Sequence, residues 1–183
     1  MNKKPIKLGK SKAVEDVTKC YEEILTGTIL CVDPSSGSGS SMPGYALYEA
    51  GELQEHGIVD ILKVGQKVQN RLRELAISFR DDFDKVDVLV IEDIPPIHGG
   101  GRGRFGSQMK SHASLLKSVG CIIGAVDSDH VVSIHPRVWQ KWKDENYVKS
   151  DHADATYIGI AAIEMSKMIK EKIEKAKAKK GKK

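Results

Sequence analysis

The chain has 183 residues, of which 40% are hydrophobic and 30% are charged. This length suits one α/β domain with terminal extensions and is too short to favour two independent cores, and the composition excludes a fibrous or wholly disordered protein. The net charge of +4 is uneven, because residues 167–183 carry +7 from nine Lys and two Glu and leave −3 on the remainder. A lysine-rich end attracts polyanions such as nucleic acid, but it is equally typical of a solvated tail.

The cysteines and the apolar segments indicate the compartment. Cys20, Cys31 and Cys121 are widely separated and odd in number, which favours neither a zinc ribbon nor a disulfide framework. No apolar signal-peptide core follows Met1, and no run of about 18 apolar residues is present to cross a bilayer. We therefore expect a cytoplasmic protein without membrane contacts.

We expect three parts along the chain. Residues 1–27 form an N-terminal extension that can dock as one helix, residues 28–166 form the folded domain, and residues 167–183 form the basic C-terminal tail. The domain begins with a predicted three-stranded meander over residues 28–33, 44–49 and 52–60, because short turn-forming segments separate these extended runs.

Two further strands are predicted in the second half. Residues 86–91 are β-branched and apolar along nearly their whole length, which is typical of a strand buried on both faces of a partly parallel sheet. Residues 93–106 are rich in Pro, Gly and Arg and predict a long exposed loop. Residues 131–134 supply another short strand.

Three helices complete the predicted domain. Apolar residues recur at three-and-four spacing from Val64 to Phe83, which predicts an amphipathic helix that ends near residue 84 and covers one sheet face. A second helix is expected over residues 107–119. Ser150 is a suitable N-cap for a third helix that begins at Asp151.

Four carboxylates are placed where they can meet. Asp33 and Glu92 each end a predicted buried strand, and ligands gather at the carboxyl ends of parallel strands. Asp151 and Asp154 share the first turn of the last helix, so their side chains can lean toward one point. With no Lys or Arg between them, such acids repel one another and are tolerated mainly around divalent cations.

The donor type indicates the cation and its chemistry. Oxygen-only ligands favour Mg²⁺, with Mn²⁺ as a substitute, over zinc. Two such ions about 4 Å apart can activate water and stabilise the leaving oxygen of a phosphodiester. Each acid alone has a simpler interpretation as a turn, strand-end or first-turn residue, but their order and setting favour a joint site.

The motifs around these acids resemble those of RuvC-type Holliday junction resolvases, which belong to the RNase H-like superfamily. The resemblance covers about residues 28–165. It is carried by Ile29-Leu30-Cys31-Val32-Asp33-Pro34-Ser35-Ser36 with the following strand Gly44-Tyr45-Ala46-Leu47, by Leu89-Val90-Ile91-Glu92, and by Asp151-His152-Ala153-Asp154-Ala155.

The resemblance implies an RNase H-like fold of the α/β class, with a central mixed five-stranded sheet flanked by helices. It also implies a homodimer that cuts branched DNA, four-way junctions in particular, with two Mg²⁺ ions per site. Asp33, Glu92, Asp151 and Asp154 would be catalytic residues and metal ligands, with Asp33 bridging the two ions. The chain departs from the family after Glu92, where Pro95-Pro96 and extra glycines replace a shorter stretch, so substrate geometry is less firmly implied than chemistry.

Basic and aromatic residues are candidates for DNA contacts. Arginines and an aromatic ring on the loop after Glu92 suit phosphate neutralisation and base stacking, although a plain surface loop is the alternative. Trp139 and Trp142 alternate with basic residues, but two such rings on a helix are more often packing residues. The candidates are Arg102, Arg104, Phe105, Lys110, Arg137, Lys141, Lys143 and Lys149.

Nucleotide-binding motifs are excluded. Residues 101–106 match Gly-x-Gly-x-x-Gly, but the glycines begin several residues after the strand, whereas a phosphate-binding turn follows its strand directly. The preferred hypothesis is therefore a structure-selective endodeoxyribonuclease for four-way junctions. Two alternatives stay open: another RNase H-like nuclease acting on flaps, RNA/DNA hybrids or RNA precursors, and a non-catalytic nucleic-acid-binding module.

Overall fold

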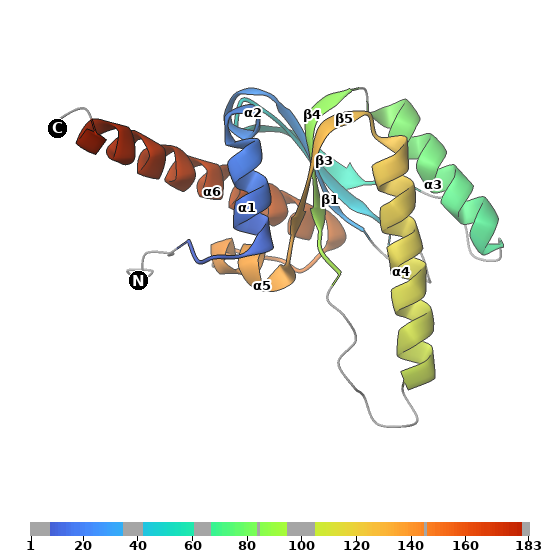
Figure 1. Ribbon diagram of the computed structural model, residues 1–183. Coiled ribbons are helices and arrows are strands. Elements are labelled where there is room, and N and C mark those ends of the chain that lie inside the picture. Colours follow the sequence, from blue (N-terminus) through green and yellow to red (C-terminus); the bar gives the residue numbers. More distant parts are fainter. Residues whose placement is uncertain are drawn as a thin grey trace.

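A mixed five-stranded sheet lies at the centre of the computed structural model (Figure 1). The structure describes residues 8–34, 42–60, 67–83, 85–94, 105–144 and 146–180. The strands are β1 (Thr28–Asp33), β2 (Gly44–Glu49), β3 (Glu52–Ile58), β4 (Val86–Glu92) and β5 (Ser128–Ile134), in the order β3-β2-β1-β4-β5. The first three strands pair antiparallel, whereas β1, β4 and β5 are parallel. The predicted meander and the mixed five-stranded sheet are confirmed.

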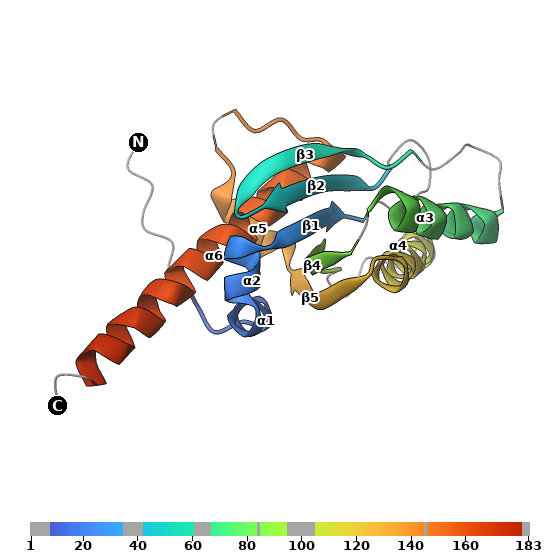
Figure 2. The same ribbon diagram turned by 90° about the horizontal axis from the view of Figure 1, so that it is seen from above.

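Helices cover both faces of this sheet (Figure 2). The helix α3 (Val68–Asp82) and the helix α4 (Phe105–Ala125) lie on one face. The other face carries α1 (Lys12–Lys19), α2 (Tyr21–Thr26), α5 (Pro136–Trp139), the 3-10 helix η1 (Gln140–Trp142) and α6 (Asp151–Lys180). The parallel strands β1 and β4 are therefore buried on both sides, which explains their continuous apolar sequences.

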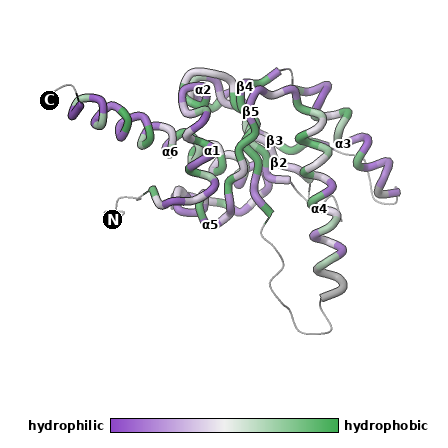
Figure 3. The backbone as a smooth tube through the Cα atoms, viewed as in Figure 1, coloured by the Kyte–Doolittle hydropathy of each residue, from purple (hydrophilic) through white to green (hydrophobic). Residues whose placement is uncertain are grey.

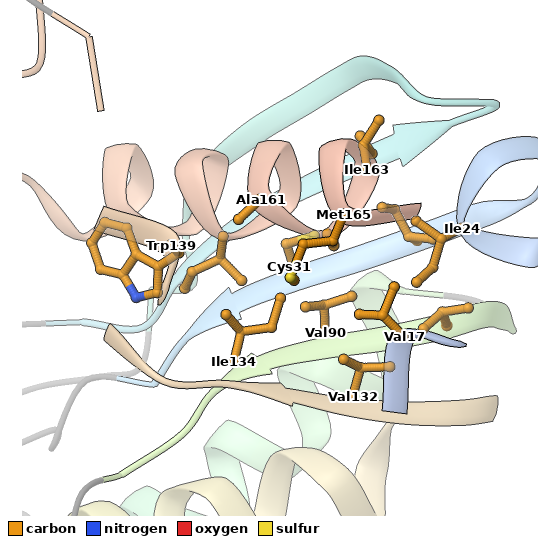
Figure 4. Close-up of a cluster of buried hydrophobic side chains, with 14 of the residues drawn as sticks. Val17, Ile24, Cys31, Val90, Val132, Ile134, Trp139, Ala161, Ile163 and Met165 are labelled. Atoms are coloured by element: carbon orange, nitrogen blue, oxygen red, sulfur yellow. The ribbon is translucent and has the colours of Figure 1, made fainter. Parts of the chain in front are cut away.

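Each face has its own hydrophobic core. Leu75, Phe79 and Ile122 pack beneath α3 and α4. The larger core lies on the α6 face, where the side chains in Figure 4 converge from strands and helices that are distant in sequence. Trp139 is only 2% exposed there, so the packing interpretation of this residue is confirmed and a DNA contact through its ring is excluded.

The N-terminal extension contributes to the larger core. It contains two helices in place of the single expected one, because the chain turns at Cys20 between α1 and α2. Val17 and Ile24 are fully buried, one from each helix. Ser11 caps α1 by accepting a hydrogen bond from the Val14 N–H at 3.3 Å.

Two elements are longer than predicted. Helix α4 passes through Gly120 and ends at Ala125, because burial of Ile122 outweighs the cost of about 1 kcal/mol for a glycine in a helix. Strand β5 begins at Ser128 and not at residue 131. Helix α6 runs to Lys180, and Figure 3 shows its outer end as mainly hydrophilic. No helix in the described ranges is long and apolar enough to span a membrane.

Gly159 allows α6 to pack closely on β2, and we predict that Gly159→Ala destabilises the fold. A Cβ atom there would lie 2.3 Å from Cε2 of Tyr48, whose hydroxyl donates a hydrogen bond to the Thr156 carbonyl at 2.7 Å. We expect a loss of about 1–3 kcal/mol in the free energy of unfolding, measured by urea denaturation with circular dichroism.

The matched control is Gly124→Ala in α4, where a Cβ atom meets nothing within 4 Å. This change gains helix propensity without a clash and should stabilise by up to about 1 kcal/mol. Equal effects of the two substitutions would show that the Tyr48 contact does not limit the packing of α6.

Candidate functional site

Asp33 and Glu92 lie side by side at the carboxyl edge of the sheet. The parallel pairing of β1 and β4 places Val32 opposite Ile91, so the next residue of each strand is an acid. Their side chains are hydrogen bonded to each other, with the Glu92 carboxyl donating to the Asp33 carboxylate. Two acids in such contact share a proton unless a cation replaces it.

The first turn of α6 reaches this edge because β2 begins with a glycine. Gly44 pairs with Asp33 in the antiparallel ladder, and a Cβ atom on Gly44 would lie 2.1 Å from the Asp151 carbonyl oxygen. The missing side chain lets the start of α6 rest on β2. The predicted N-cap is confirmed, because the Ala153 N–H donates to Ser150 Oγ at 3.3 Å.

The acids raise one another's pKa. Burial, followed by the charges of Asp154 and Asp151, raises the pKa of Asp33 to about 7, although the hydrogen bond from Glu92 opposes this shift. Burial and the neighbouring charge of Asp33 raise the pKa of Glu92 to about 9, and Asp154 adds to the shift. The charge of Asp154 therefore affects the pKa values of both Asp33 and Glu92, whereas the charge of Asp151 affects that of Asp33.

Asp154 has partners of its own. The Tyr147 hydroxyl donates a hydrogen bond to Asp154 Oδ1, and Lys143 Nζ lies 3.8 Å from the same oxygen. The Lys143 ammonium also sits 3.6 Å from the centre of the Tyr147 ring and 4.7 Å from that of Trp139. The expectation that no Lys lies among the four acids is therefore wrong, since Lys143 also lowers the pKa of Glu92.

The donor set fits a hard divalent cation in its chemistry. Carboxylate oxygens are the ligands of Mg²⁺ and Mn²⁺, and burial together with the neighbouring carboxylates raises the pKa values of Asp33 and Glu92. As the side chains stand, no group of three or more His, Cys, Asp or Glu within the described ranges is arranged to hold an ion. Asp33, Glu92, Asp151 and Asp154 are the residues whose oxygens would hold such an ion.

The remaining candidates are spread over several elements. Lys110 on α4, Arg137 on α5, Lys141 on η1 and Lys149 ahead of α6 are all exposed. Phe105 begins α4, but its side chain lies outside the described residues, as do Arg102 and Arg104. The structure thus brings Lys143 to the acids, while the other described candidate bases are exposed and form no ion pair with them.

Sequence reasoning missed two contributors to the site. Tyr147 lies in an irregular segment, where no periodicity indicates which way its side chain points. His56 on β3 stacks on His152 of α6 with ring centres 5.3 Å apart, a pairing between segments almost a hundred positions apart. The close approach at Gly44 could have been predicted from the sequence, because a glycine in a strand often marks a place where another backbone comes close.

The acid pair predicts an unusual pH dependence of stability in buffers without divalent cations. Both pKa values are raised above their ordinary values of 3.8 and 4.5, so between about pH 5 and 9 the folded state holds protons that the unfolded state releases. Stability from this source is present below pH 4 and is lost as pH rises toward 9.

Glu92→Gln should remove most of this loss of stability at high pH. The variant keeps only the acid Asp33, and the neutral amide of the glutamine can donate a hydrogen bond to it. Since one pKa unit corresponds to about 1.4 kcal/mol, we expect the variant to be more stable than the natural chain by ~1 kcal/mol or more at pH 9. Urea unfolding at pH 5, 7 and 9 in EDTA measures this difference. A difference that is constant with pH would contradict the assignment.

Comparison with known proteins supports the fold assignment. No protein-family model and no curated protein sequence matches the chain. Among solved structures, RuvC of T. thermophilus in complex with a Holliday junction substrate is similar with a TM-score of 0.52 and 11% identity, over 80% of this chain and 95% of that chain. A second Thermus thermophilus RuvC structure gives a TM-score of 0.46 and 11% identity, over 80% and 96%. The chain therefore has the RNase H-like fold that its motifs predicted.

Proposed function

We propose that this chain is a metal-dependent endodeoxyribonuclease that resolves four-way DNA junctions. The observation that supports the proposal is the hydrogen-bonded pair of Asp33 and Glu92 at the carboxyl edge of an RNase H-like sheet, with the charge of Asp154 acting on both. A pair of partly buried acids with raised pKa values in such a position indicates a functional site. The similar RuvC structure holds a Holliday junction substrate, which favours the same class of DNA here.

The proposed ligands of two Mg²⁺ or Mn²⁺ ions are Asp33, Glu92, Asp151 and Asp154. Bound ions would supply charge neutralisation and water activation at a DNA phosphate. Asp33 is hydrogen bonded to Glu92 and is affected by the charges of Asp154 and Asp151, which supports a role for it toward both ions. Lys143 remains beside the acids and is placed to balance negative charge that develops on the phosphate.

A homodimer is part of the proposal, and α4 offers a surface for it. Met109, Leu116 and Ile123 are 50%, 50% and 38% exposed, and with Ala113 and Gly120 they follow one another at alternating spacings of four and three. This spacing forms one apolar stripe along a helix, as in helices that pair with a second helix. The N-terminal half of α4 projects beyond the sheet, where a second copy can reach it (Figure 1).

Cleavage assays on defined substrates test the activity. With Mg²⁺, we expect paired cuts on a labelled four-way junction, and we expect EDTA to abolish them. Asp33→Asn should lower the rate by about 100-fold or more, because it removes the charge shared by both ions. The matched control is Asp129→Asn, an exposed acid at the opposite end of the sheet that pairs only with Lys85 in the described residues.

The substrate panel separates the alternatives. A preference for flaps or RNA/DNA hybrids over junctions would replace resolution with another RNase H-like nuclease activity. Binding of junctions without cleavage in either Mg²⁺ or Mn²⁺ would favour a non-catalytic module.

The stripe on α4 predicts the oligomeric state. Leu116→Glu places a charge in the middle of the apolar stripe and should convert a dimer into a monomer in sedimentation equilibrium. Lys117→Gln, on the polar flank of the same helix, should leave the dimer intact. A natural chain that is monomeric both alone and on a junction would contradict the homodimer.

A further inference from the structure

A second feature lies at the same edge of the sheet, one strand beyond the acids. It is a cleft of about 380 Å³ between the start of α1, the ends of β4 and β5, and the start of α5. The residues that supply its polar groups are Ser11, Lys12, Asp93, Ser133, His135 and Arg137. The N-terminal extension therefore forms one wall of it.

The cleft is tied to the acid pair by the backbone. Asp93 directly follows Glu92, and its N–H donates a hydrogen bond to the Ile134 carbonyl at 3.0 Å, which links the exit of β4 to the end of β5. Neighbouring strands are about 4.8 Å apart. A nucleic acid strand that reaches Glu92 along this edge therefore meets the cleft next.

The polar groups of the cleft are mainly donors. Lys12 and Arg137 are exposed and form no ion pair with any residue that the structure describes. His135 accepts a hydrogen bond from the Arg137 N–H at its Nδ1, at 3.1 Å, so the neutral ring carries its proton on Nε2 and can donate. Ser11 accepts from Val14 through its oxygen and keeps its hydroxyl proton to donate.

One carboxylate opposes this arrangement. Asp93 is exposed on the same cleft, and it weakens the attraction of Lys12 and Arg137 for an anion. Lys12 and Arg137 together still outweigh Asp93, so the net charge of the cleft is positive. Neutralising the two bases should therefore weaken the binding of an anion, whereas neutralising Asp93 should strengthen it.

We propose that this cleft binds a backbone phosphate of the nucleic acid strand next to the cleaved bond, and that the N-terminal extension takes part through Lys12. The inference rests on the proposed function for its substrate class, but it concerns residues outside the acid site. Phosphate contacts of this kind fix the register of a strand without reading its sequence.

Binding of a fluorescent four-way junction in EDTA, followed by anisotropy from 50 to 200 mM salt, tests this site without cleavage. The double variant Lys12→Gln/Arg137→Gln should bind several-fold more weakly, with the slope of log affinity against log salt reduced by about 1. Asp93→Asn should bind more tightly than the natural chain, because it removes the opposing charge.

The matched control is Arg80→Gln/Lys85→Gln, which also removes one Arg and one Lys. Both are exposed and lie at the opposite end of the sheet, where each forms a surface ion pair that contributes little to stability. The junction affinity of this control variant and its salt slope should stay close to those of the natural chain. Urea denaturation midpoints of all variants check that each one folds.

Three results would overturn the inference. One is that both double variants behave alike, and another is that Asp93→Asn weakens binding. The third is that Lys12→Gln/Arg137→Gln binds the junction as tightly as the natural chain, while inorganic phosphate raises the melting temperature of the natural chain and not of this variant. That result would indicate a site for small anions. If the natural chain cuts junctions, these results reject the cleft alone; if it neither binds nor cuts nucleic acid, the proposed function and the inference both fail.

Discussion

The contact between Asp33 and Glu92 is the constraint around which the rest of the edge is arranged. Burial and the neighbouring carboxylates disfavour the ionisation of these two acids, which lie at the ends of adjacent buried strands, and raise their pKa values. A fold that only had to be stable would gain by replacing one acid with a neutral group. The presence of both Asp33 and Glu92 is explained if binding of a ligand at these acids offsets their cost in folding stability.

Parts of the structure far from the pair position the other two acids. Gly44 has no side chain, so α6 begins against β2, and Gly159 repeats this close approach about two turns further along, against Tyr48. The helix is therefore held to the meander at both places, and its first turn cannot drift from the end of β1. Tyr147 and Lys143 then hold the Asp154 carboxylate through a hydrogen bond and an ion pair.

Much of the fold could be predicted from sequence, because β1 and β4 are buried on both faces and show it as unbroken apolar runs. The cap at Ser150 likewise depends on local chemistry. What could not be predicted depends on tertiary packing: the entry of Val17 and Ile24 into the core, the continuation of α4 through Gly120, and the approach of Lys143 to Asp154. The roles of the four acids and of the DNA-binding residues remain predictions.

The distribution of positive charge shows why the lysine-rich tail is a poor guide to the site. Helix α6 has Asp151 at one end and the tail lysines at the other, and 30 residues at 1.5 Å each separate these ends by about 45 Å. Figure 1 shows the C-terminal end pointing away from the sheet. The end of the described helix at Lys180 is therefore far from any phosphate held at the acids of the same chain. The bases nearer to the acids are Lys143 beside Asp154, and then Lys12 and Arg137 at the cleft one strand away, and none of them stands out in the overall composition.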